Sequence, residues 1–143
     1  MAATSERLLG NISQLNASLS EDLASGTSLI GRWTAGRIVG LLASPLQQSA
    51  VHMAVGVSAL PAGVATPFHE HEAEELAIVI SGSGVIDIGA ETIAVQAGDV
   101  VLTPPRAVHR TGAAKDALTV LWIYAPSGSE LRWLAGLDEE VPV

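Results

Sequence analysis

Residues 63–82 read GVATPFHEHEAEELAIVISG, and this stretch predicts both a fold class and a site. In residues 75–80 large and small apolar side chains alternate, which is the period-two pattern of a β-strand with one buried face. The preceding residues follow Pro67, so we expect an extended backbone there. Residues two apart in an extended segment point to the same side. His69 and His71 are therefore placed to share one metal ion.

Two further side chains fit the same site. Glu75 has the parity of the smaller residues of its strand, which suits a cavity wall, whereas Glu74 has the opposite parity and is expected in solvent. Residues 98–109 read GDVVLTPPRAVH, and the two prolines form a rigid connection that can deliver His109 to the same cavity. The acidic residues between the ligands, at positions 70, 72 and 74, should point outward.

Both stretches resemble the two motifs of the cupin superfamily. The first has Gly63, five residues, His69-Glu70-His71, three residues, Glu75, six residues and Gly82; the second has Gly98, five residues, Pro104, one residue, Arg106, two residues and His109. The resemblance covers roughly residues 50–125 and departs from the family pattern at Arg106, where glycine is usual, and at Ala113, where asparagine is common.

That resemblance implies a cupin-type antiparallel β-barrel, jelly-roll-like, and commonly a homodimer. It also implies one divalent metal, held by His69, His71, Glu75 and His109. We favour Fe(II), with Mn, Ni, Zn or Co as alternatives. Four ligands leave two neighbouring positions of an octahedral metal for exchange, which is typical of an enzyme rather than of a structural site.

Five other residues are candidates for roles at the site, each with a structural alternative. Arg106 beside the metal loop could anchor a substrate carboxylate, or could be a solvated loop arginine. His52 could be a catalytic acid or base, or simply be packed on its strand. Tyr124 could donate a hydrogen bond in the pocket beside Trp122, although such aromatic pairs are often core. Thr103 is expected in the pocket wall.

The pocket wall is otherwise expected to be apolar, with Ala77, Val79 and Val101 beside Thr103. Trp33 and Trp133 lie outside the motif region. Such a wall suits a carbonyl, enol or keto-acid substrate better than a sugar.

The rest of the chain predicts an all-β domain with a helical extension. Apolar residues from Leu8 to Leu23 recur at helical spacing, with Ser5 as N-cap and Gly26 as stop. Residues 1–30 thus form the extension and residues 31–143 one cupin domain. Hairpin turns are expected at 81–84 and 89–91, and the tail from Ser127 as a short helix capping one end of the barrel. The expected strands are 37–43, 51–60, 75–80, 84–88, 92–95, 100–103 and 117–124.

Composition excludes several classes of function. The net charge of −8 argues against nucleic acid or anionic membrane as a partner, and the absence of cysteine excludes a thiolate site. No secretion signal or apolar span is recognisable, so a cytoplasmic protein with a small-molecule substrate is expected. A dioxygenase is slightly favoured over a redox-neutral lyase, isomerase, cyclase or decarboxylase. The alternative from another class is a non-catalytic binding cupin.

Overall fold

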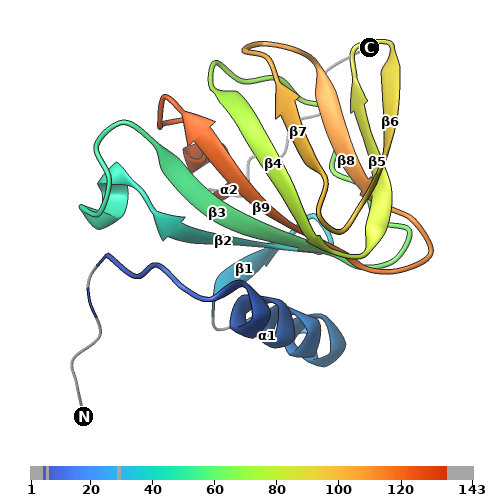
Figure 1. The fold of residues 1–143 in the computed structure, drawn as a ribbon, viewed down its shortest axis with the longest axis horizontal. Helices are drawn as coiled ribbons and strands as arrows, with labels where there is room; N and C mark the ends of the chain where they lie inside the picture. Colours follow the sequence, from blue (N-terminus) through green and yellow to red (C-terminus); the bar gives the residue numbers. More distant parts are fainter. Residues whose placement is uncertain (1–4, 6, 29, 135–143) are drawn as a thin grey trace.

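Two antiparallel β-sheets face one another, with a helix outside the larger one (Figure 1). The computed structural model describes residues 5, 7–28 and 30–134. Its elements are α1 Ile12–Ser25, β1 Gly31–Thr34, β2 Arg37–Ala43, the 3-10 turn η1 Pro45–Gln47, β3 Ala54–Leu60, β4 Glu74–Ser81, β5 Ser83–Ile88, β6 Glu91–Gln96, β7 Val100–Thr103, β8 His109–Ala113, β9 Leu118–Ala125 and α2 Leu131–Leu134.

The sheets have six and three strands, in the orders β1-β2-β3-β9-β4-β7 and β6-β5-β8. They remain two separate sheets, so the fold is jelly-roll-like rather than a fully closed barrel. The predicted turn at 89–91 is confirmed, because Ile88 pairs with Glu91. The predicted hairpin at 81–84 is wrong, since β4 and β5 belong to different sheets. Gly82, at φ 84°, is instead the crossing point, where a Cβ would collide with the Ala117 carbonyl.

The helix α1 begins later than its apolar pattern predicts. Asn11, not Ser5, is the N-cap, and its side chain accepts a hydrogen bond from the Gln14 amide. Ser5 instead caps a separate turn by accepting from the Arg7 amide. The predicted stop at Gly26 is confirmed by its left-handed backbone. No helix in the described part of the chain has the length and apolarity that a membrane span requires.

The larger sheet is buried on its inner face and is covered on part of its outer face by α1. On the outer face, Leu19 of α1 packs against Ile38, Val57 and Ala59 of β2 and β3. On the inner face, the side chains toward one end of the inter-sheet space are apolar, and those toward the other end surround the histidines. The apolar set is Ala77, Val79, Ile86, Val95, Val101, Leu118 and Val120. Because side chains alternate along a strand, Ile38 points toward α1, whereas Arg37 and Val39 point into the space between the two sheets.

Three strand predictions were wrong in detail. The strand β3 begins at Ala54, not at residue 51, so His52 lies in an exposed bend. The short hairpin strand β1 and the strand β8 were not predicted. β8 reads HRTGA and lacks apolar alternation, because what holds it is backbone pairing with β5 rather than a buried face of its own.

Candidate metal centre

The histidine-bearing segment before β4 is held in place by β8. His69 and His109 exchange both backbone hydrogen bonds at 2.9 Å, and the Thr66 amide donates to the Thr111 carbonyl at 2.8 Å. Residues 69–75 then alternate strictly between buried and exposed, so the acidic residues at 70, 72 and 74 face solvent as predicted. Pairing across two distant parts of the sequence thus brings three histidines together.

Each of these histidines is fixed by a hydrogen bond from Nδ1 to a backbone carbonyl two residues away. The Nδ1···O distances are 2.7 Å for His69 to Pro67, 2.9 Å for His71 to Ala73 and 2.7 Å for His109 to Ala107. A carbonyl can only accept, so Nδ1 carries the proton and Nε2 keeps its lone pair. This arrangement orients imidazoles toward a metal.

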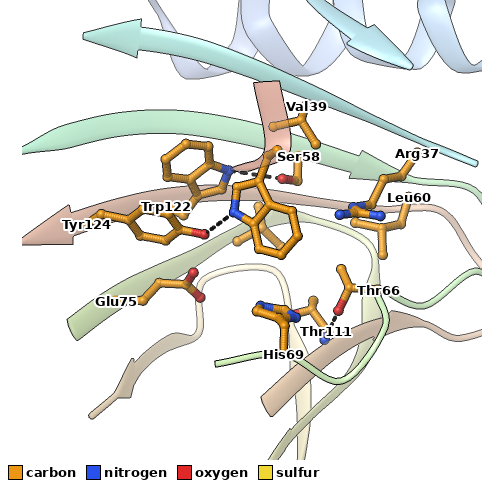
Figure 2. A pocket seen from close by; sticks show the side chains of 12 residues that line it. Arg37, Val39, Ser58, Leu60, Thr66, His69, Glu75, Thr111, Trp122 and Tyr124 are labelled. Atoms are coloured by element: carbon orange, nitrogen blue, oxygen red, sulfur yellow. Dashed lines mark hydrogen bonds between the residues drawn. The ribbon is translucent and has the colours of Figure 1, made fainter. Parts of the chain in front are cut away.

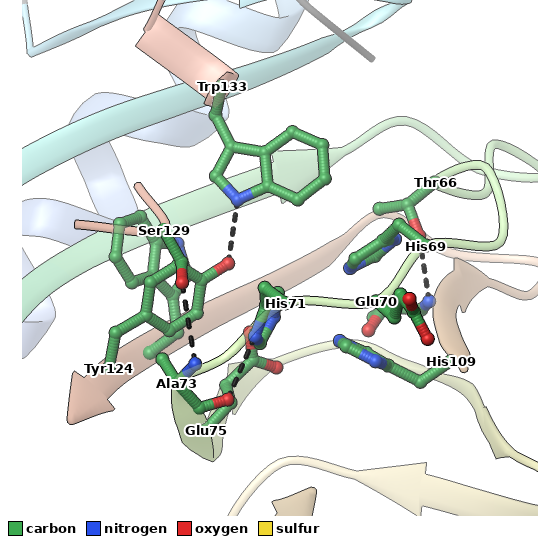
Figure 3. Close-up of polar contacts among 12 residues, drawn as sticks. Thr66, His69, Glu70, His71, Ala73, Glu75, His109, Tyr124, Ser129 and Trp133 are labelled. Carbon is green, nitrogen blue, oxygen red and sulfur yellow. Dashed lines mark hydrogen bonds and ion pairs between the residues drawn. The ribbon is translucent and has the colours of Figure 1, made fainter. Parts of the chain in front are cut away.

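The three free lone pairs converge on one point. The candidate ligand atoms of His69, His71 and His109 all lie within 4.8 Å of one another, and Figure 3 shows the three rings turned toward each other. Nε2 of His71 and Nε2 of His109 are buried and have no hydrogen-bond partner within the described residues. Orphaned buried acceptors are costly in a folded protein. A bound divalent metal satisfies them, so the donor set fits the metal that the sequence predicts.

Glu75 lies at the edge of this cluster. Its Oε1 is 3.6 Å from Nε2 of His71, and the residue is buried. Burial alone would raise the pKa of Glu75, but its interaction with the adjacent His71 side chain outweighs burial and lowers the pKa. A carboxylate that stays ionised beside three imidazoles suits a fourth metal ligand, as the sequence predicts.

Burial keeps the imidazoles of His69 and His109 neutral. It lowers the pKa of His69 to about 3, and repulsion from His109 adds to the effect. Burial likewise lowers the pKa of His109, with Glu75 and the Ala107 carbonyl opposing the shift. Neutral imidazole is the form that binds a metal.

Comparison with known proteins places this architecture in a family. The family model described as a cupin domain matches residues 56–124. An uncharacterised protein of Streptomyces coelicolor is 35% identical over 78 residues, which are 54% of this chain and 74% of the relative. The chain belongs to the cupin family.

Solved structures carry the same fold. An RmlC-like cupin from Shewanella frigidimarina is 15% identical with a TM-score of 0.63, over 71% of this cupin and 86% of that chain. A structure reported for the DMSP lyases RdDddP and RnDddQII is 26% identical with a TM-score of 0.57, over 64% of this cupin and 48% of that chain.

The structure shows how Arg106 is accommodated at the position where the family motif usually has glycine. Arg106 has φ 62°, the left-handed region that favours the glycine usual there. Its side chain is 66% exposed and pairs with Glu72 at 2.6 Å on the surface. It does not line the cavity beside the histidines, so the predicted carboxylate anchor at Arg106 was misplaced. The predicted acid or base His52 also lies outside the cavity lining, in its exposed bend.

The remaining predicted residues lie in or beside the site. Trp122 and Tyr124 are buried, stacked at 4.6 Å, and both line the cavity. The indole of Trp122 donates to the Ser58 hydroxyl at 2.9 Å. Thr103 is buried and pairs with Glu75 across β4 and β7 but does not line the cavity. Ala77, Val79 and Val101, which were predicted as cavity wall, belong instead to the apolar core.

Sequence reasoning missed most of the cavity lining, including two residues that bear on the chemistry of the site. Trp133 was set aside as outside the motif region, yet its indole lies 4.7 Å from the His69 ring and donates to the Tyr124 hydroxyl at 2.7 Å. Arg37 is 2% exposed and lines the same cavity. The sequence contains one signal for this position, because Arg37 and Val39 are two residues apart on a strand and so point to the same face.

The cavity itself is small. Its volume is about 40 Å³, and its wall includes His69, Glu75 and Tyr124 with Arg37 across from them (Figure 2). Trp133 narrows it, because α2 carries that side chain against His69. Burial raises the pKa of the Tyr124 phenol well above 10, and the nearby Glu75 carboxylate adds to the shift. Tyr124 is therefore a protonated donor in a largely water-excluded space.

Proposed function

We propose that this cupin is a mononuclear metal enzyme acting on a small organic substrate that binds the metal through oxygen. The observation that carries the proposal is the set of three buried histidines whose Nδ1 atoms bond to carbonyls, while Nε2 of His71 and His109 has no hydrogen-bond partner in the part of the chain that the structure describes. His69, His71, His109 and Glu75 would hold the metal, with Fe(II) favoured. A bound metal would supply Lewis acidity toward a substrate oxygen and, as ferrous iron, reactivity with dioxygen.

The residues around the centre have definable tasks. The Tyr124 oxygen accepts from Trp133, so its own proton can be donated to a developing negative charge on substrate oxygen. Trp122 and Trp133 exclude water from the cavity, which strengthens such a contact. Glu75 stays ionised beside His71, whose ring is oriented by the bond from Nδ1 to the Ala73 carbonyl.

Two reaction classes are proposed on this site. A dioxygenase is favoured slightly, since three histidines and one glutamate with open neighbouring positions suit ferrous iron. A redox-neutral lyase is the second candidate, supported by the likeness to a structure reported for DMSP lyases and by the protonated Tyr124 beside Glu75.

The test begins with elemental analysis of wild type, His71→Ala and the matched control His52→Ala after loading with iron. Stoichiometric metal in wild type and in the control, with loss in His71→Ala, supports the site. Oxygen uptake by the iron-loaded protein with β-diketones, catechols and keto acids then favours the dioxygenase, whereas product formation without uptake favours the lyase. Wild type that cannot be loaded with any divalent metal contradicts the proposal.

A further inference from the structure

The cavity beside the histidines has a cation on its opposite side. Of the described residues that line it, Arg37 is the basic side chain other than histidine, and Glu75 is the acidic one. Arg37 is 2% exposed, while long cations usually keep their charge in water. Its charge acts on the cavity interior, because it partly offsets the rise in the pKa of Tyr124 that burial causes. Arg37 therefore adds positive charge to this side of the cavity.

The polar groups near Arg37 are arranged to donate. Ser58 Oγ accepts from the Trp122 indole at 2.9 Å, and Thr66 Oγ1 accepts from the Thr111 amide at 3.0 Å. Each hydroxyl oxygen thus has a donor already, and its own O–H proton is the donor it still offers. Figure 2 shows Arg37 beside Leu60 and Thr66, away from Tyr124 and Glu75. This side of the cavity therefore suits an anion, and the Glu75 side does not.

Arg37 is also integrated into the protein. Its guanidinium lies 5.3 Å from the centre of the Trp133 ring, and it makes further interactions within the chain. A guanidinium carries five N–H donors in a fixed fork, so an intramolecular partner and a ligand can share it. The planar fork matches the two oxygens of a carboxylate.

The volume of the cavity limits the size of the ligand that it can hold. A cavity of about 40 Å³ has room for roughly three waters at about 10–15 Å³ each, which corresponds to a carboxylate and little more. We infer that the Arg37 side of the cavity binds the carboxylate of a short 2-oxo or 2-hydroxy acid, whose second oxygen is directed to the histidine centre. This inference rests on the proposed function and names its substrate class.

The test compares pyruvate with methyl pyruvate, which differ in the negative charge. Binding to zinc-loaded and to metal-free protein is measured by calorimetry, so that no turnover is required. Wild type should prefer pyruvate by about 10- to 100-fold, the range for a hydrogen bond to a charged group. Arg37→Gln should lose that preference while its affinity for the ester stays within about twofold. Arg106→Gln, which removes an exposed arginine outside the cavity, should keep it.

The outcomes separate the two proposals. Equal affinity of wild type for acid and ester, or an unchanged preference in folded Arg37→Gln, overturns the carboxylate site. Should Arg37→Gln fail to fold, Arg37→Lys keeps the charge without the fork and should show a reduced but still positive preference; a full preference contradicts the inference. An Arg37-dependent preference in protein that takes up no metal sustains this site and removes the proposed function instead.

Discussion

The two ends of the space between the sheets are built from the same strands but do different work. β4 places Val79 in the apolar core and Glu75, four residues earlier, beside the histidines. β9 likewise places Leu118 at one end and Tyr124 at the other. The apolar end is filled by packed side chains, whereas Nε2 of His71 and Nε2 of His109 at the other end have no hydrogen-bond partner among the described residues. Packing at one end thus fixes the register that positions the chemistry at the other.

The largest effect is expected from a substitution at the apolar end, which tests whether stability and metal binding depend on different ends of the molecule. Ile86→Ala removes a side chain that is 2% exposed and packs between the sheets. We expect a loss of about 2–5 kcal/mol in the free energy of unfolding, from lost transfer energy and a residual cavity. Denaturant titration measures it, and zinc stoichiometry of the folded variant should be unchanged. Loss of zinc without loss of stability would show that the ends are not separable.

The converse experiment damages the histidine end of the space between the sheets, with the substitution His109→Ala. Zinc should stabilise wild type by about 2.7 kcal/mol at a free concentration one hundred times its dissociation constant, and should no longer stabilise the variant at that concentration. The reason is that Nε2 of His109, which has no hydrogen-bond partner among residues 5, 7–28 and 30–134, is a ligand atom that the variant lacks. Thermal unfolding with and without zinc checks this, with Ile86→Ala as the control that retains the zinc-dependent increment. A zinc effect of equal size in both variants would contradict the assignment.

The sequence was sufficient for the β-fold and for the three histidines, although it assigned Ala77, Val79 and Val101 to the cavity wall instead of the apolar core. Local periodicity predicted the strand at 75–80 and the shared side of His69 and His71, and the resemblance of residues 98–109 to the second cupin motif added His109. What it missed depends on long-range pairing. The strand β8 exists because β5 pairs with it, and Trp133 reaches His69 because α2 folds back over the cavity. Arg106 was considered as a carboxylate anchor because it lies near His109 in sequence, whereas Arg37 lines the cavity beside the histidines.

A smaller effect is expected where the three-stranded sheet supports the histidine segment. Asp87 accepts from the Thr92 hydroxyl at 2.7 Å and from Nε of Arg110 at 2.9 Å, and the Arg110 guanidinium lies over the Phe68 ring. The hydrogen bond from Thr92, followed by that from Arg110, lowers the pKa of Asp87 below its usual 3.8. A carboxyl with a lowered folded pKa contributes stability above its unfolded pKa and loses it as the pH falls through the folded value.

Asp87→Asn should therefore lower the free energy of unfolding by about 1 kcal/mol at neutral pH. A larger loss is not expected, because the Arg110 side chain is 42% exposed and solvent partly screens its charge. The difference between wild type and variant should shrink as the pH falls below about 4. Urea titrations across pH measure it. A difference that is constant down to pH 2 would mean that the charge of Asp87 contributes nothing.

The smallest expected effect tests the loop beside the metal centre. Arg106→Gly removes an exposed ion pair worth about 0–1 kcal/mol and relieves a left-handed backbone that costs an L-residue about 1–2 kcal/mol. Glycine also gives the unfolded chain more conformational freedom, which destabilises the folded protein by about 0.5–1 kcal/mol and offsets part of the strain relief. The net change in unfolding free energy should stay within about 0.5 kcal/mol. Arg106→Gln loses the ion pair but keeps the φ of 62°, so the glycine variant should be the more stable of the two. If glutamine equals or exceeds glycine, the turn carries no strain, and the arginine at this position is as well suited to the loop as glycine.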